Sequence, residues 1–288
     1  MAMIRSAGGY ASYGLQRRLG SLAVYAVLIV VGCLIIVPFL WMVNTSLKPA
    51  PEIMLRDPTF FPQDPTLIHF RNLFVRVNYF TNLFNSLFVA SVTTAISIFF
   101  STMVGYGIAK FRCKGLNALL IVFLSAMMFP PFLIAIPLYM VAAGLGVVNS
   151  LWAVIIPFSI SNFGIFLMRQ FCLSIPNDLL DAARIDGASE FSILLRVVFP
   201  VVATGCVAMG ILKFLMTWND FFWPLIMLTG DRKMTLPVVL STLVDFEYYV
   251  DYGLVMALTT LVVVPVVILF LIFQKRIIEG VTISGMKG

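Results

Sequence analysis

The stretch from Leu19 to Val43 reads LGSLAVYAVLIVVGCLIIVPFLWMV and decides the class of fold, because it contains no charged residue. About 20 consecutive apolar residues are enough for a helix to cross the hydrocarbon core of a bilayer. The run is longer than the apolar region of a secretion signal, and no small-residue cleavage site follows it. Trp41 and the polar residues 44–48 close the run, as is typical of a helix that reaches the water interface. We therefore predict a permanent membrane-spanning helix.

The composition extends this prediction to the whole chain. Of the 288 residues, 61% are hydrophobic and 11% are charged, whereas a soluble domain is about half apolar and about a quarter charged. The apolar residues lie in long runs, which predict spans at about residues 20–43, 83–109, 116–141, 151–171, 199–228 and 254–274. The predicted fold class is all-α integral membrane, with six transmembrane helices in a single domain over residues 1–288.

The lysines and arginines are divided unevenly between the two ends of these runs. With six spans both termini lie on one side, and that side holds twelve of the 19 Lys and Arg residues against six on the other. Because cations accumulate in cytoplasmic loops, the termini and the segment 172–198 are predicted to be cytoplasmic. This placement accounts for the net charge of +6, so no nucleic-acid partner is expected.

Few residues are suited to catalysis or metal binding. The four cysteines, Cys33, Cys113, Cys172 and Cys206, are far apart, so we interpret them as small buried apolar side chains without a disulfide framework or metal-ligand spacing. The single histidine, His69, is expected in a loop. We therefore expect no catalytic residues and no metal site.

Several prolines fall inside the predicted spans, among them Pro130, Pro131 and Pro224. Proline is common in membrane helices, so these residues are consistent with ordinary kinks. A broken helix is also tolerated where it lines a water-filled cavity. The alternative is that these three prolines bend helices that line a pathway.

The segment IPNDLLDAARIDGASEFSILLRVVFP, residues 175–200, predicts two short cytoplasmic helices. Asn177 or Asp178 is placed to cap the first helix. Gly187 is placed to end it, because glycine readily takes the left-handed conformation at a helix terminus. Ser189 is placed to cap the second helix.

The same segment has an apolar face. Leu179, Leu180 and Ala183 share one side of the first helix at spacings of three and four residues. Glu190 falls in the first turn of the second helix, and Pro200 fits the first turn of the span that follows. A loop with its own helices and an apolar face is expected to dock on another surface.

These residues resemble the signature of the permease subunits of ATP-binding-cassette (ABC) importers, which is Glu-Ala-Ala, three residues, Gly, nine residues and Ile-x-Leu-Pro. The chain has Asp181-Ala182-Ala183, then Gly187, then Val197-x-Phe199-Pro200 at the same spacing. Asp for Glu, Val for Ile and Phe for Leu are its three departures, all chemically close. The resemblance implies that a cytoplasmic two-helix coupling loop, residues 172–198, acts on an ATPase through Asp178, Asp181, Ala182, Ala183, Gly187, Glu190 and Arg196.

Further stretches resemble the carbohydrate branch of this family, the maltose-type second permease. They are residues 85–87 (NSL), 105–110 (GYGIAK), 136–139 (IPLY), 218–225 (WNDFFWPL) and 280–288 (GVTISGMKG). The resemblance implies a multi-pass permease in the bacterial inner membrane. Its implied partners are the lipid bilayer, a homologous second permease subunit, two cytoplasmic ABC ATPase subunits and a periplasmic or extracellular solute-binding protein.

No Gly-rich phosphate loop of the form G-x-x-x-x-G-K-[ST] occurs in the sequence. The chain is therefore expected to bind no cofactor and to be no enzyme, with ATP and magnesium on the partner ATPases. In the family, the loop before the last span can reach the binding protein. Here that loop contains Asp245, Phe246, Glu247 and Tyr248, and a plain solvated loop is the alternative.

Lys213 departs from the neutral residue that the family usually has at its position. It lies halfway along the predicted fifth span, where a lysine costs on the order of 2.5–3.5 kcal/mol. Asp220 is expected on the same face but about 10 Å away, too far for a direct pair. Lys213 is predicted either to pair with a carboxylate of the second permease or, with Trp218, Asn219 and Asp220, to line the substrate pathway and favour an acidic sugar.

The predicted function is the ATP-driven import of a carbohydrate, an oligosaccharide that is acidic if Lys213 lines the pathway. The alternatives are an ABC permease for a sugar phosphate such as glycerol 3-phosphate, and an ion-coupled secondary transporter. A secondary transporter usually needs acids within the membrane or an inverted repeat, and the sequence shows only Lys213 and Asp220 at depth.

Overall fold

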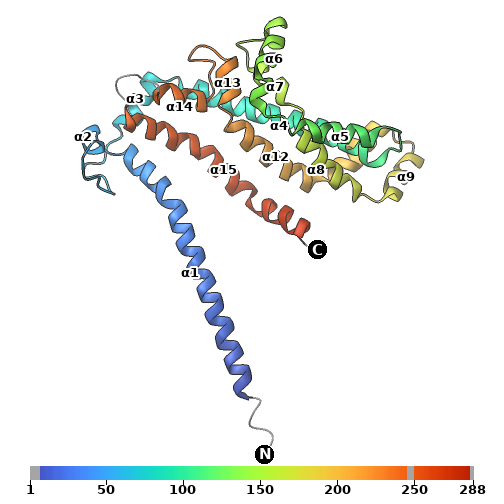
Figure 1. The fold of residues 1–288 in the computed structure, drawn as a ribbon, viewed down its shortest axis with the longest axis horizontal. Coiled ribbons are helices and arrows are strands. Elements are labelled where there is room, and N and C mark those ends of the chain that lie inside the picture. The colour runs from blue at the N-terminus through green and yellow to red at the C-terminus, as the bar shows by residue number, and fades with distance from the viewer. Residues whose placement is uncertain (1–6, 245–249, 286–288) are drawn as a thin grey trace, which may run out of the picture. The chain divides into compact units, whose positions relative to one another are not determined.

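Helices are the regular secondary structure of the part that the structure describes, residues 7–244 and 250–285 of the computed structural model (Figure 1). It forms two compact units, one with residues 7–72 and 251–260, the other with residues 73–244, 250 and 261–285. Helices α3 (Ile68–Arg76) and α15 (Tyr252–Gly285) contribute to both units. The all-α prediction is confirmed.

The first unit begins with α1 (Ala7–Ser46), a helix of 40 residues with Pro38 in its interior. From Gly20 to Leu40 almost every described side chain is exposed, although the sequence there is apolar. An apolar helix that is exposed all round is suited to lipid or to a partner chain and not to water. This helix is long and apolar enough to cross a bilayer.

Three ionisable side chains are buried after α1, in the first unit: Lys48, Glu52 and His69. The Lys48 ammonium donates to the carbonyl of Thr59, whose hydroxyl donates to Glu52, in α2 (Ala50–Ile53), at 2.7 Å. His69 Nε2 donates to Lys48 O at 2.8 Å. The prediction of His69 in a loop is wrong, because the residue lies in α3 and ties that helix to the turn after α1.

The second unit is built around α4 (Tyr79–Lys110), against which α7, α8 and α12 pack. Figure 1 shows α4, α8 and α12 lying alongside one another. The further helices are α5 (Leu116–Ala126), α6 (Pro131–Gly144), α7 (Leu151–Phe158), α8 (Asn162–Leu173), α12 (Ala203–Trp218), α13 (Phe222–Met227) and α14 (Leu236–Val244). The loop between α8 and α12 holds four shorter elements, which are described with the site.

Three of the described helices, α1, α4 and α15, are each long and apolar enough to cross a bilayer. Three more candidates are bent pairs: α5 with α6 at 102°, α7 with α8 at 46°, and the helix Glu190–Val201 with α12 at 81°. Six spans result if each bent pair is one span, so that number stays a prediction. The expected span 199–228 is interrupted in the structure, because the chain bends at Val202 and breaks again between α12 and α13.

Buried polar side chains recur along α4 at spacings of three, four and seven residues. They are Asn82, Asn85, Ser86, Thr93, Thr94, Ser97, Ser101 and Thr102. Large apolar side chains such as Phe80, Phe84 and Phe100 are exposed instead. In lipid a polar side chain is better placed against a neighbouring helix than outside, so this reversed pattern is typical of a membrane helix.

The cysteines follow the prediction only in part. Cys172 is buried and Cys206 is half-buried, but Cys33 and Cys113 are exposed. Cys33 lies on the exposed helix α1, and Cys113 lies in the turn after α4, so neither has protein around it. All four are free thiols.

Gly105 allows a close approach between α4 and α8. A Cβ atom there would lie 2.7 Å from Arg169 N and 3.0 Å from Met168 C, whereas a Cβ atom at Gly107 would meet nothing within 4 Å. We predict that Gly105→Ala lowers the thermal unfolding midpoint, because overpacking costs about 1–3 kcal/mol. Gly107→Ala should leave the midpoint unchanged or raise it. Thermal unfolding of the purified protein in detergent compares the two variants, and equal midpoints would contradict the close approach.

Candidate functional site

The loop between α8 and α12 contains two short helices, α9 (Asn177–Ile185) and α10 (Glu190–Ile193). Gly187 separates them with φ +80°, and no atom lies within 4 Å of a Cβ built on it. The position therefore requires a left-handed backbone and not empty space. Ser189 Oγ accepts from Ser192 N at the start of α10, so the predicted end of the first helix and the predicted cap of the second are both confirmed.

The predicted side-chain cap of α9 is wrong. Pro176 occupies the N-cap position, and neither Asn177 nor Asp178 caps the helix through its side chain. Lys110, the last residue of α4, explains the difference, because its ammonium donates to Asn177 Oδ1 at 3.0 Å and to Ile175 O at 2.6 Å. A tertiary contact thus takes the oxygen that a local cap would have used, and it fastens the start of α9 to the end of α4.

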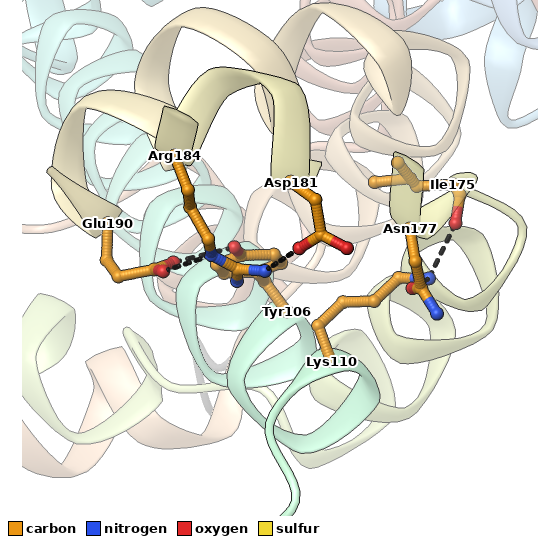
Figure 2. A network of polar contacts seen from close by, with 7 residues as sticks. All are labelled: Tyr106, Lys110, Ile175, Asn177, Asp181, Arg184 and Glu190. Atoms are coloured by element: carbon orange, nitrogen blue, oxygen red, sulfur yellow. Dashed lines mark hydrogen bonds and ion pairs between the residues drawn. The ribbon is translucent and has the colours of Figure 1, made fainter. Parts of the chain in front are cut away.

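A second link joins the two short helices to each other and to α4, as Figure 2 shows. Glu190 accepts from Tyr106 Oη at 2.9 Å through Oε2 and from Arg184 Nε at 2.7 Å through Oε1. Arg184 Nη1 also donates to Asp181 Oδ1 at 2.7 Å. The bonds to Glu190 and then to Asp181 raise the pKa of the Arg184 guanidinium above its usual value, so it stays charged. Tyr106 comes from α4, Asp181 and Arg184 from α9, and Glu190 from α10.

The underside of the loop is apolar and packs on the second unit. Leu180 and Ile193 are buried together with Tyr106 and Met168, and Ala183 is half-buried beside them. The predicted apolar face of α9 is therefore correct for Leu180 and Ala183. It is wrong for Leu179, which is 43% exposed and faces away from this core.

The outer surface of the loop carries large apolar side chains among charged ones. Ile185 is 86% exposed, Phe191 is 58% exposed and Leu179 is 43% exposed. Six of the predicted coupling residues are exposed as well: Asp178, Asp181, Ala182, Gly187, Glu190 and Arg196. We call this surface, made of Leu179, Ala182, Ile185 and Phe191 with its charged neighbours, the outer face of the loop.

The loop is continuous with the helix that follows it. α10 runs into a π-helical turn (Leu194–Val198), in which Phe199 N donates to Leu194 O, and then into α11 (Phe199–Val201). Pro200 lies near the end of this helix and not in the first turn of the next span as predicted, because the 81° bend falls after it, at Val202. The two-helix loop thus ends in a continuous helical arm, Glu190–Val201, that reaches α12.

A cavity of about 330 Å³ opens beside the C-terminal half of α12. It is lined by Pro131, Phe132, Ala135, Leu138, Val154, Phe158, Lys213, Met216, Thr217, Asp220, Phe222 and Trp223. The structure brings the predicted pathway residues Lys213 and Asp220 together here. Asp220 comes after the end of α12 and not on its face, because the helix stops at Trp218.

Two other predicted pathway residues do not reach this cavity. Trp218 is buried and stacks on Phe214 at 6.0 Å between ring centroids. Asn219 is exposed and donates through Nδ2 to Leu215 O at 2.9 Å. Of the three singled-out prolines, Pro131 alone lines the cavity.

The predicted binding-protein contact, Asp245, Phe246, Glu247 and Tyr248, lies outside the described residues. Within the described part of the chain, no group of three or more His, Cys, Asp or Glu side chains is placed to hold a metal ion.

Sequence reasoning missed three residues that hold the loop and four aromatic residues that line the cavity. In the sequence, Tyr106 and Lys110 were noted only as part of the family stretch 105–110. Arg184 was counted only among the lysines and arginines of the cytoplasmic side. Phe222 and Trp223 stood only in the family stretch 218–225, and Phe132 and Phe158 were indistinguishable from other membrane aromatics. The sequence offered one signal for the residues that hold the loop: Lys110 is the last residue of α4, immediately before a turn that carries Arg112 and Lys114.

The helices and the docked loop together define a multi-pass membrane permease, and comparison with known proteins supports this class. Residues 97–283 match the family described as "Binding-protein-dependent transport system inner membrane component". The chain is 39% identical to the arabinooligosaccharides transport system permease protein AraQ of Bacillus subtilis (strain 168), over 87% of this chain and 90% of that protein. It is 33% identical to the sulfoquinovosyl glycerol transport system permease protein SmoH of Agrobacterium fabrum (strain C58 / ATCC 33970), over 87% and 88%.

A solved structure agrees with the fold. The bacterial ABC transporter involved in the import of the acidic polysaccharide alginate matches with a TM-score of 0.81 over 90% of this chain and 97% of that chain, at 23% identity. The chain therefore belongs to the family of binding-protein-dependent transport system inner membrane components, the permease subunits of ABC transporters. The family resemblance drawn from the sequence is confirmed.

The two carboxylates of the loop should differ in their structural effect. Glu190 accepts from two donors on two helices, whereas Asp181 accepts from one donor three residues along its own helix. We predict that Glu190→Gln speeds amide hydrogen exchange over residues 177–193 by about fivefold, which is about 1 kcal/mol. Asp181→Asn should change it less than twofold. Exchange followed by mass spectrometry compares them, and a larger effect of Asp181→Asn would contradict the bridging role of Glu190.

Proposed function

We propose that this chain is the membrane-spanning permease subunit of an importer that translocates a carbohydrate and is driven by ATP hydrolysis in partner ATPase subunits. The observation that carries the proposal is the loop 172–198, which is fastened to the chain on one side and exposes apolar side chains on the other. Exposed apolar side chains grouped among charged ones are typical of a protein-protein contact. The outer face of the loop is therefore the proposed contact with an ATPase.

The contacts beneath the loop would carry movement of the ATPase into the membrane helices. Lys110 and Tyr106 connect α9 and α10 to the end of α4, and the helix from Glu190 to Val201 connects them to α12. Packed helices move as rigid bodies rather than deforming continuously. Closure of the ATPases would then shift α4 and α12 together and change access to the pathway between the two permeases.

The proposed substrate class is an oligosaccharide. The matched relatives are named for arabinooligosaccharides, sulfoquinovosyl glycerol and lactose, and the matched structure for alginate. A sugar phosphate such as glycerol 3-phosphate remains the alternative cargo for the same ABC permease. An ion-coupled secondary transporter is disfavoured by the family.

The remaining parts of the proposed assembly follow from the family. The partners are a homologous second permease subunit, two ABC ATPases that bind ATP and magnesium, and a solute-binding protein outside. The chain would lie in the bacterial inner membrane with both termini and the loop 172–198 in the cytoplasm. Asp245, Phe246, Glu247 and Tyr248 would then contact the binding protein on the opposite side.

Gly187 provides a test of coupling with a matched control. Gly187 and Gly146 both have positive φ, +80° and +68°, and a Cβ atom at either would meet nothing within 4 Å. Alanine therefore introduces a similar strain of about 1–2 kcal/mol at both. We predict that Gly187→Ala reduces uptake and substrate-stimulated ATP hydrolysis in the reconstituted transporter severalfold, whereas Gly146→Ala, in the turn between α6 and α7, keeps both. Equal activity of the two variants would contradict the coupling role of the loop.

Ile185 provides a test of the contact itself. Because its side chain is almost fully exposed, Ile185→Asp should leave the fold of this chain unchanged. We predict that the ATPase no longer co-purifies with the Ile185→Asp permease, while Ile185→Val retains it. Retention of the ATPase by both variants would place the contact elsewhere.

A further inference from the structure

The cavity beside α12 has walls of aromatic rings with few polar groups. Phe132 contacts Phe222 with ring centroids 4.6 Å apart, and Phe158 contacts Trp223 at 5.7 Å, both edge to face. Trp223 Nε1 donates to Ala153 O at 3.0 Å, which holds the indole in place. Small-molecule sites are typically of this kind, mostly apolar with a few placed polar groups.

Lys213 is the cation of this cavity, and the carboxylate of Asp220 is its electrostatic neighbour there. Its ammonium makes no hydrogen bond or ion pair within the described chain, and its nearest ring contact is Phe158, with the nitrogen 6.0 Å from the ring centroid. Asp220 lines the same cavity but does not pair with it. Asp220 Oδ1 instead accepts from Trp223 N at 3.4 Å, in the first turn of α13. The carboxylate is thus used to hold the aromatic wall.

A charge at this depth calls for compensation. A lysine within a membrane helix is costly and is usually found facing a water-filled cavity or an opposite charge. The protein places this lysine among rings that could contact the apolar faces of a sugar. A lysine ammonium is a compact charge on a flexible stem, able to hold an anionic group without fixing it in one geometry.

We propose that this cavity is a subsite for an anionic saccharide, in which Lys213 binds a carboxylate of the sugar while the aromatic walls contact its ring. This inference rests on the proposed function and narrows its substrate to an acidic oligosaccharide. Asp220 acts as a positioning residue that orients Trp223 and leaves Lys213 free.

The charge of the cavity can be measured without knowing the natural substrate. In the assembled transporter, Thr217→Cys places a thiol on the cavity wall, one helical turn from Lys213. An anionic reagent (2-sulfonatoethyl methanethiosulfonate) and a cationic one (2-(trimethylammonio)ethyl methanethiosulfonate) are then compared by their labelling rates at residue 217, read by peptide mass spectrometry. The ratio of the two rates cancels any effect on thiol reactivity alone.

We predict that Lys213→Met lowers the anionic-to-cationic rate ratio about tenfold or more, because one unit charge is removed from a confined space. Lys213→Arg should keep the ratio, and so should the control Lys114→Met, which removes an exposed cation from the turn after α4. In the Thr217→Cys protein that retains Lys213, trigalacturonate should slow the labelling of residue 217, whereas galactotriose and sodium sulfate should not. An unchanged ratio would show that the second permease neutralises Lys213 and would overturn the proposal, as would equal protection by galactotriose or by sulfate.

These outcomes are separate from those that test the importer itself. ATPase co-purification and ATP-dependent uptake depend on the loop 172–198, whereas the rate ratio requires neither ATP nor transport. If the transporter is coupled to its ATPase but Lys213→Met leaves the rate ratio unchanged, the proposed function stands and the acidic subsite is ruled out.

Discussion

The contact between α4 and α8 at Gly105 leaves no room for a methyl group, and most of the second unit depends on it. Along α4 the hydroxyl side chains are buried and the phenylalanines Phe80, Phe84 and Phe100 are exposed, while the amides of Asn82 and Asn85 donate to backbone carbonyls of the loop 231–234. The same helix then supplies Tyr106 and Lys110, which bond to residues of the loop 172–198. One helix thus provides the packing surface of the unit and the anchor of the proposed contact with the ATPase. A change in its position is transmitted to both.

Local rules were sufficient where a residue acts on its immediate neighbours in the chain. Gly187 and Ser189 end and begin helices as their chemistry predicts, and the long apolar runs gave the helical class directly. The rules failed where a distant donor competes. Asn177 does not cap α9, because Lys110, 67 residues earlier, takes its side-chain oxygen. No spacing pattern in the sequence encodes that pairing.

The cavity shows the same limit in another form. Hydropathy predicted one continuous fifth span and therefore placed Lys213 and Asp220 on a single helical face. The break after Trp218 moves Asp220 off the helix, yet the folded chain returns it to the same cavity. The sequence thus predicted correctly that Lys213 and Asp220 line the same space, but it did so by placing both on one helix. The aromatic walls come from α6, α7 and α13, and only the tertiary arrangement of these helices selects Phe132, Phe158, Phe222 and Trp223 from 26 phenylalanines and four tryptophans.

The π-helical turn at Leu194–Val198 has a consequence for how the length of this chain can vary. A π turn holds about one residue more than an α turn. The surplus residue is contained within a single turn. The helical segments before and after it therefore keep the rotational orientation that they would have in a plain α-helix one residue shorter. A homologous chain with one residue fewer here would form a plain α-helix and present the same side of its loop. A deletion elsewhere in the arm Glu190–Val201 would instead rotate the loop by about 100°. A one-residue deletion within this turn should therefore disturb the facing of the loop less than a deletion elsewhere in the arm.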